Sequence, residues 1–118
     1  NCSNCYLLTS LEGAPKEVRG SFMCERCDSL ISLKGLPEKI GGSFDCSNCR
    51  ELITLKGGPI RVNKVFDCNN CYKLRSLEGI PKYIGGDLNA CVRSTNNRGF
   101  DYEELDELNT IIKGDIRL

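Results

Sequence analysis

The chain has 118 residues, with 16 basic and 16 acidic side chains and therefore no net charge at neutral pH. Nucleic-acid-binding proteins normally carry a basic excess, so this balance argues against direct binding of DNA or RNA. The absence of histidine excludes a Ser-His-Asp triad, a Cys-His pair and any metal site built on imidazole. No apolar run approaches the roughly 18 residues that a membrane helix needs, and no secretory signal is visible, so we expect a cytoplasmic location and no membrane partner.

A 22-residue repeat organises the chain from its first residues to about residue 88. Each unit carries a C-x-x-C pair, two leucines three residues apart, a glycine, a proline, a valine or isoleucine, and a closing phenylalanine or leucine. A fixed period of this length predicts a solenoid, because one unit is too small to bury its own apolar face and must stack on its neighbours. The paired cysteines are Cys2 and Cys5, Cys24 and Cys27, Cys46 and Cys49, and Cys68 and Cys71.

The repeat matches the leucine-rich-repeat pattern in period and in the order of its apolar positions. In the third unit, Phe44 and Cys46 alternate with Asp45, which predicts a short strand with Asp45 on the outer face. Cys49 falls at the corner position of the motif, and Leu52 then turns inward. We expect short parallel strands on a concave face and irregular, polyproline-like arcs on a convex face. Residues 1–88 would form four such repeats.

The repeat dissolves after Leu88, and residues 89–118 are predicted to hold a degenerate fifth strand and a C-terminal cap. Asp101 and Glu104 have the spacing of a helix N-cap and capping box. The apolar stripe that follows predicts a helix over about 101–112, ended by Gly114, with a last short strand after it. We expect this segment to seal the open end of the solenoid. A partner-binding helix is the alternative.

Nine cysteines allow three readings, as zinc ligands, disulfides or core residues. Repeated C-x-x-C pairs suggest zinc, but the eight paired cysteines occupy positions that the repeat needs for core filling, and free cysteine behaves as a small buried apolar residue. Side chains stacked in parallel have poor geometry for disulfides, and a reducing compartment disfavours them. We therefore predict a ladder of free thiols and no cofactor. Cys91 lies one residue out of register and is the thiol expected to be exposed.

The outer positions of the predicted strands would form polar columns across the concave face, and extended faces of this kind are typical binding surfaces of solenoids. On the convex arc, Arg61, Lys64 and Lys82 predict a small basic strip among ordinary surface charges. No catalytic constellation is visible, so we do not expect an enzyme. The candidate partner-binding residues are Met23, Glu25, Arg26, Asp45, Ser47, Asn48, Val65, Asp67, Asn69, Asn70, Asp87 and Asn89.

The segments L-T-S-L-E-G-A-P-K-E-V, over residues 8–18, and I-G-G-D-L, over residues 84–88, resemble the short leucine-rich repeats of proteins from tailed bacteriophages and large viruses, in their cysteine-containing form. The tail from Phe100 to Leu118 is similar to the ends of such phage proteins. This resemblance implies a non-catalytic protein-binding module that blocks a host protein, such as a component of CRISPR or another defence system. The alternatives are a zinc-stabilised structural domain, or the repeat tail of a larger enzymatic or virion protein.

Overall fold

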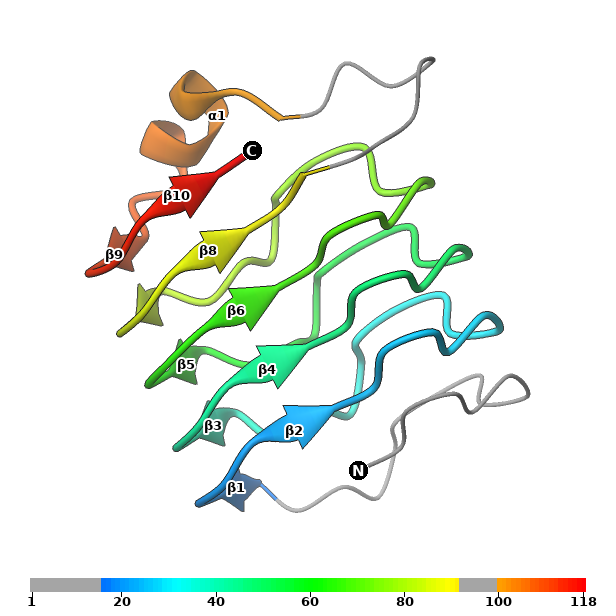
Figure 1. Cartoon of the computed structure of the whole chain (residues 1–118), viewed down its shortest axis with the longest axis horizontal. Helices are drawn as coiled ribbons and strands as arrows, with labels where there is room; N and C mark the ends of the chain where they lie inside the picture. Colours follow the sequence, from blue (N-terminus) through cyan, green and yellow to red (C-terminus); the bar gives the residue numbers. More distant parts are fainter. Residues whose placement is uncertain (1–15, 92–99) are drawn as a thin grey trace.

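The computed structural model describes residues 16–91 and 100–118, and in them the chain winds into a solenoid of parallel strands. Each coil contributes two strands of two residues, and each strand pairs with its equivalent in the next coil (Figure 1). Sheet A contains β1 (Glu17–Val18), β3 (Lys39–Ile40), β5 (Arg61–Val62), β7 (Tyr83–Ile84) and β9 (Ile111–Ile112). Sheet B contains β2 (Phe22–Met23), β4 (Phe44–Asp45), β6 (Phe66–Asp67), β8 (Leu88–Asn89) and β10 (Ile116–Arg117).

The apolar repeat positions face the space between the two sheets. The phenylalanines of sheet B stack along the solenoid, with ring centroids 6.2 Å apart for Phe22 and Phe44 and 5.3 Å apart for Phe44 and Phe66. Leu88 continues this column and is fully buried. Because the pairing partners of β1 to β8 are one 22-residue repeat apart, each apolar position packs on its own equivalent in the next coil.

Sheet A corrects the expectation of irregular, polyproline-like arcs opposite the first sheet. The backbone there forms regular coil-to-coil hydrogen bonds, such as Gly41 N to the Val18 carbonyl at 2.7 Å and Gly85 N to the Val62 carbonyl at 2.9 Å. Its strands alternate an exposed or half-buried residue with a valine or isoleucine that is buried in β3, β5 and β7. That alternation is typical of a strand with one face in the core. In the sequence, only the isolated valine or isoleucine of each repeat indicates the strands of sheet A.

The C-terminal helix is shorter than predicted: α1 spans Tyr102–Glu107, whereas the sequence suggested a helix over about 101–112. Asn109 adopts a left-handed conformation, with φ of 55°, which ends the helix. Ile111 N then bonds to the Lys82 carbonyl at 3.0 Å, so Ile111 and Ile112 join sheet A as β9. β-branched residues favour a strand over a helix when a sheet edge is available to them.

The last residues, within 111–118, add one further strand to each sheet, and α1 lies beside them at this end of the stack (Figure 1). Leu105 of α1 is buried in the same apolar cluster as the coils. Asp101 is the N-cap and accepts a hydrogen bond of 2.8 Å from Glu104 N, as the sequence predicted. The Glu104 carboxylate does not close a reciprocal capping box. It accepts a hydrogen bond of 2.7 Å from Leu77 N and so ties the helix to the fourth repeat.

Candidate functional site

The structure places the predicted partner-binding residues along sheet B and the turns that follow its strands. Met23, Asp45, Asp67 and Asn89 pair in direct register and form one outer column. Exposure varies within the set, because Arg26 is exposed and Ser47 is buried. The other members are partly exposed: Met23, Glu25, Asp45, Asn48, Val65, Asp67, Asn69, Asn70, Asp87 and Asn89.

Several polar groups on this face also hold the backbone. Asp45 Oδ1 accepts a hydrogen bond of 2.8 Å from Ser47 N, and Asp67 Oδ1 accepts one of 2.9 Å from Asn69 N. Asn69 Oδ1 in turn accepts from Cys91 N of the next coil at 2.8 Å. An aspartate that bonds to the backbone two residues ahead stabilises a turn. The two aspartates therefore have a structural role that sequence reasoning missed, although the D-x-[SN] spacing could have signalled it.

The electrostatics of the outer column change along the solenoid. Burial, together with the nearby Asp45 carboxylate, raises the pKa of Asp67 above its ordinary value. At the C-terminal end, the Arg117 guanidinium donates to Asp87 Oδ2 at 2.9 Å, and this bond lowers the pKa of the Asp87 carboxyl. The face is therefore negative in its middle coils and partly neutralised at its end.

The turn inside each of the three described C-x-x-C pairs contains a left-handed residue. Arg26, Asn48 and Asn70 have φ of 56°, 60° and 58°. Asparagine tolerates this conformation better than other non-glycine residues, whereas arginine is strained there. Asn70 Nδ2 also donates to Asn48 Oδ1 at 3.4 Å, so the asparagines form a column of their own. The asparagine in the sequence pattern C-x-N-C thus indicates a position where the backbone must be left-handed.

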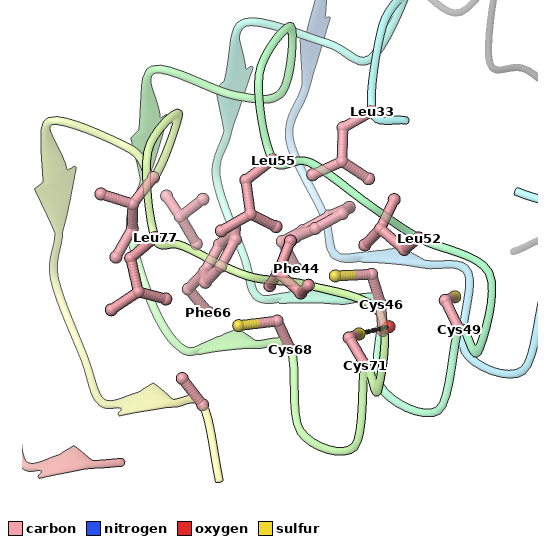
Figure 2. Close-up of a cluster of buried hydrophobic side chains, with 14 of the residues drawn as sticks. Leu33, Phe44, Cys46, Cys49, Leu52, Leu55, Phe66, Cys68, Cys71 and Leu77 are labelled. Atoms are coloured by element: carbon pink, nitrogen blue, oxygen red, sulfur yellow. Dashed lines mark hydrogen bonds between the residues drawn. The ribbon is translucent and has the colours of Figure 1, made fainter. Parts of the chain in front are cut away.

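The cysteine pairs lie in the core (Figure 2). All six paired cysteines between Cys24 and Cys71 are fully buried, and none is in a disulfide. Cys49 Sγ donates to the Cys24 carbonyl oxygen, and Cys71 Sγ donates to the Cys46 carbonyl oxygen, each at 3.2 Å. Within the described residues, no three Cys, Asp or Glu side chains are grouped so that they could hold a metal ion. Cys2 and Cys5 lie outside the described residues.

Burial also determines the chemistry of these thiols. It raises the pKa of the Cys68 thiol well above its ordinary value, and hydrogen bonding to Cys71 with burial does the same for Cys46. At Cys49, hydrogen bonding to Cys24 outweighs burial and lowers the pKa of the thiol. A thiol that stays protonated is a poor nucleophile and a poor metal ligand. Cys91 is half-buried, whereas the described paired cysteines are fully buried.

The outer side of sheet A carries the opposite charge. Sheet A and its flanks, over residues 16–19, 38–41, 60–64, 82–85 and 111–113, hold seven exposed basic and two exposed acidic residues. The sheet B strands and turns, over residues 21–26, 43–48, 65–70, 87–91 and 115–118, hold five acidic residues, four of them partly exposed, and two exposed basic residues. Sequence reasoning noticed a small basic strip but not this segregation, because the net charge of zero conceals it.

No helix among the described residues is long and apolar enough to cross a membrane. Comparisons with protein-family models, with curated proteins and with solved structures gave no match to this chain.

Proposed function

We propose that the protein is a non-catalytic binding module that docks a partner protein on the outer face of sheet B. The observation that carries the proposal is the regular outer column of Met23, Asp45, Asp67 and Asn89, which presents one partly exposed side chain per coil. Rigid, regularly spaced side chains of this kind bind with little loss of conformational entropy. Met23 within the outer column and Val65 beside it add apolar side chains to the aspartates, and together they supply the mixed chemistry of a protein interface.

The finer parts of the proposal rest on the repeat pattern. The solenoid is of the leucine-rich-repeat type, and α1 with β9 and β10 is its C-terminal cap, a role that the buried Leu105 and the bond from Leu77 N to Glu104 support. The resemblance to phage repeats points to a phage-encoded inhibitor that acts in the host cytoplasm against a host protein, of the anti-defence or anti-CRISPR kind. A solenoid whose thiols are buried in its core suits a blocking role, since its accessible chemistry is recognition.

The test is capture of a partner by the tagged full chain from a bacterial host lysate, with the bound proteins identified by mass spectrometry. Variants at Met23→Lys, Glu25→Lys and Val65→Lys change the docking face without touching the hydrogen bonds of Asp45 and Asp67. The matched control is Ile53→Lys, because Ile53 is 56% exposed and belongs to neither sheet. We expect a stoichiometric partner that the three variants lose and the control retains. Capture of no such partner, or capture that survives all three changes, contradicts the proposal.

A further inference from the structure

The outer face of sheet A contains a hollow with an unusual set of cations. Its volume is about 510 Å³, and its lining includes Glu17, Arg19, Lys39, Gly41, Arg61 and Asn63. Gly41 contributes only backbone to this lining, and it allows the two coils to approach closely, because a Cβ at this position would lie 2.3 Å from the Arg19 carbonyl oxygen. Three basic side chains from three successive coils therefore surround a floor of backbone.

Arg61 is held in place by two contacts. Its Nε donates a hydrogen bond of 2.9 Å to Asn63 Oδ1, and its guanidinium carbon lies 4.0 Å from the centroid of the Tyr83 ring. Neither Nη of Arg61 has a partner within the described part of the chain. A guanidinium fixed in this way loses little freedom when it binds, and its free fork matches the two oxygens of a carboxylate.

The neighbours of Arg61 add charge to the same place. Lys39 pairs in register with Arg61 on the adjacent strand, and its Nζ lies 3.6 Å from the Glu17 carboxylate in an exposed ion pair. An exposed ion pair of this kind contributes little free energy, so a carboxylate of the ligand can readily replace Glu17 as the partner of Lys39. Arg19 is exposed and has no partner among the described residues. The hollow thus carries three cations and one acid, within a face that is basic overall.

From these contacts we infer that the outer face of sheet A is a second docking site, which binds an acidic segment of a protein through carboxylates held by Arg61, Lys39 and Arg19. The inference rests on the proposed function in that the ligand belongs to a partner protein. Charge complementarity favours an acidic ligand, because the five strands of sheet A form a basic surface. The acidic residues that balance this positive charge lie elsewhere in the chain. Four spacings of about 4.8 Å separate the five strands of sheet A, and an extended peptide of about six residues is long enough to cross them.

A direct titration tests this site without knowledge of the partner. The probe is a fluorescein-labelled oligo-glutamate peptide of about eight residues, long enough to cross the sheet, and its anisotropy is followed as full-length protein is added. We expect saturable binding that weakens about tenfold or more between low and high salt. Arg61→Glu combined with Lys39→Glu should weaken binding at least about tenfold. Arg61→Lys should lose part of the affinity, because a lysine keeps the charge but not the fork.

Two further variants sharpen the result. Glu17→Gln should strengthen binding, because it removes the acid that competes for Lys39. Lys34→Glu is the control: it reverses one positive charge, half the charge change of the double variant, at an exposed residue outside both sheets and should alter affinity less than about twofold. Circular dichroism spectra of all variants confirm that the fold is intact.

Several outcomes overturn the inference. These are no saturable binding of the peptide, equal loss with Lys34→Glu, or tighter binding of a duplex DNA or RNA of equal charge. If millimolar inorganic phosphate displaces the peptide and binds as tightly as the peptide does, the hollow is a site for small anions instead. The failure of this inference is distinguishable from failure of the proposed function, because variants of sheet B should leave peptide binding unchanged. Capture of a partner through sheet B by a protein that binds no acidic peptide contradicts only the second site.

Discussion

The Sγ atom of Cys71 donates a hydrogen bond of 3.2 Å to the backbone carbonyl oxygen of Cys46 in the preceding coil (Figure 2). The same bond joins Cys49 to Cys24 one coil earlier. Cys49 and Cys71, the second cysteines of their pairs, therefore each supply a donor to a buried carbonyl as well as filling space. Buried carbonyl groups need such partners, and a thiol is small enough to provide one inside an apolar core. Cys68, the first cysteine of its pair, fills space, and Ala90 occupies the equivalent position in the next coil with equal burial.

We expect Cys71→Ala to destabilise the protein by about 2 kcal/mol, because it removes both packing and the donor for the Cys46 carbonyl. Cys68→Ala in the same coil should cost about 1 kcal/mol, since it removes packing alone. Denaturant unfolding of both variants measures the difference. Cys71→Ser, which keeps a donor, should recover part of the loss. Equal stability of Cys71→Ala and Cys71→Ser would show that the hydrogen bond between coils contributes nothing.

Arg26 occupies a left-handed position that Asn48 and Asn70 fill in the next two coils. We expect Arg26→Asn and Arg26→Gly to stabilise the protein by about 0.5–1 kcal/mol, because both residues adopt positive φ at lower cost than arginine. Arg26→Ala is the control, since it removes the exposed side chain but keeps the strain. Thermal unfolding should rank asparagine and glycine above arginine and alanine. A ranking in which alanine is as stable as asparagine would exclude backbone strain as the cause.

Much of the architecture follows from the sequence because it is periodic. A 22-residue spacing implies that equivalent residues stack, and the pairing of Phe44 with Phe66 confirms it. The second sheet was not predicted, because a single buried Val62 between polar neighbours is too short to show alternation. Ile111 was misassigned for another reason: the apolar stripe from Leu105 onward fits a helical period, while the choice of strand depends on the free edge of β7, a tertiary feature.

The candidate site, too, could be predicted from the sequence only in part. The outer placement of Asp45 and Asp67 follows from strand alternation, but their bonds to Ser47 N and Asn69 N depend on the turn conformation that each strand enters. The stacking of Arg61 on Tyr83 joins residues one repeat apart whose types differ from the rest of their column. A repeat pattern predicts what its units share, and both the basic hollow and the helix contact arise where units differ.

Glu104 connects α1 to the repeats through its bond with Leu77 N. We expect Glu104→Ala to destabilise the protein by about 1–2 kcal/mol, because it leaves a partly buried backbone donor without its partner. Glu104→Gln keeps an acceptor oxygen and should cost less than half as much. Glu103→Ala is the control, since Glu103 is exposed on the same helix. Denaturant unfolding compares the three, and a result in which all three are alike would mean that this contact does not hold the helix to the solenoid.

The two aspartates of sheet B should respond to pH with opposite signs. The folded-state pKa of Asp67 is raised by burial and by Asp45, so its ionised form destabilises the fold, and stability rises as pH falls through that pKa. Asp67→Asn should therefore gain about 0.5 kcal/mol relative to wild type between pH 4 and pH 7, a modest figure because the group is partly solvated. The Asp87 pKa is lowered by Arg117, so its contribution is present at neutral pH and is lost as pH falls through that pKa.

For Asp87→Asn the variant should accordingly lose stability relative to wild type as pH rises from about 2 to about 5, the range that spans the lowered pKa and the ordinary carboxyl value. Unfolding curves at the two ends of each pH range, for each variant and wild type, give the two differences. The opposite signs are the test, since general effects of pH on the fold cancel in the comparison. Differences of the same sign for the two variants would contradict the electrostatic assignment.

The buried thiols should be inert in the native protein. The six cysteines from Cys24 to Cys71 that form pairs are fully buried, so a reagent in water cannot reach their sulfur atoms, including Cys49, whose pKa is lowered by hydrogen bonding to Cys24. Alkylation with mass-spectrometric mapping should leave these six unmodified until denaturant is added. Protein purified without chelator should contain near zero zinc, and a chelator should leave its thermal midpoint unchanged. Two or more zinc ions per chain, about the number that eight thiolates hold in Cys₄ sites, would instead mean that the sulfur atoms bind metal and that the packing of successive coils is different.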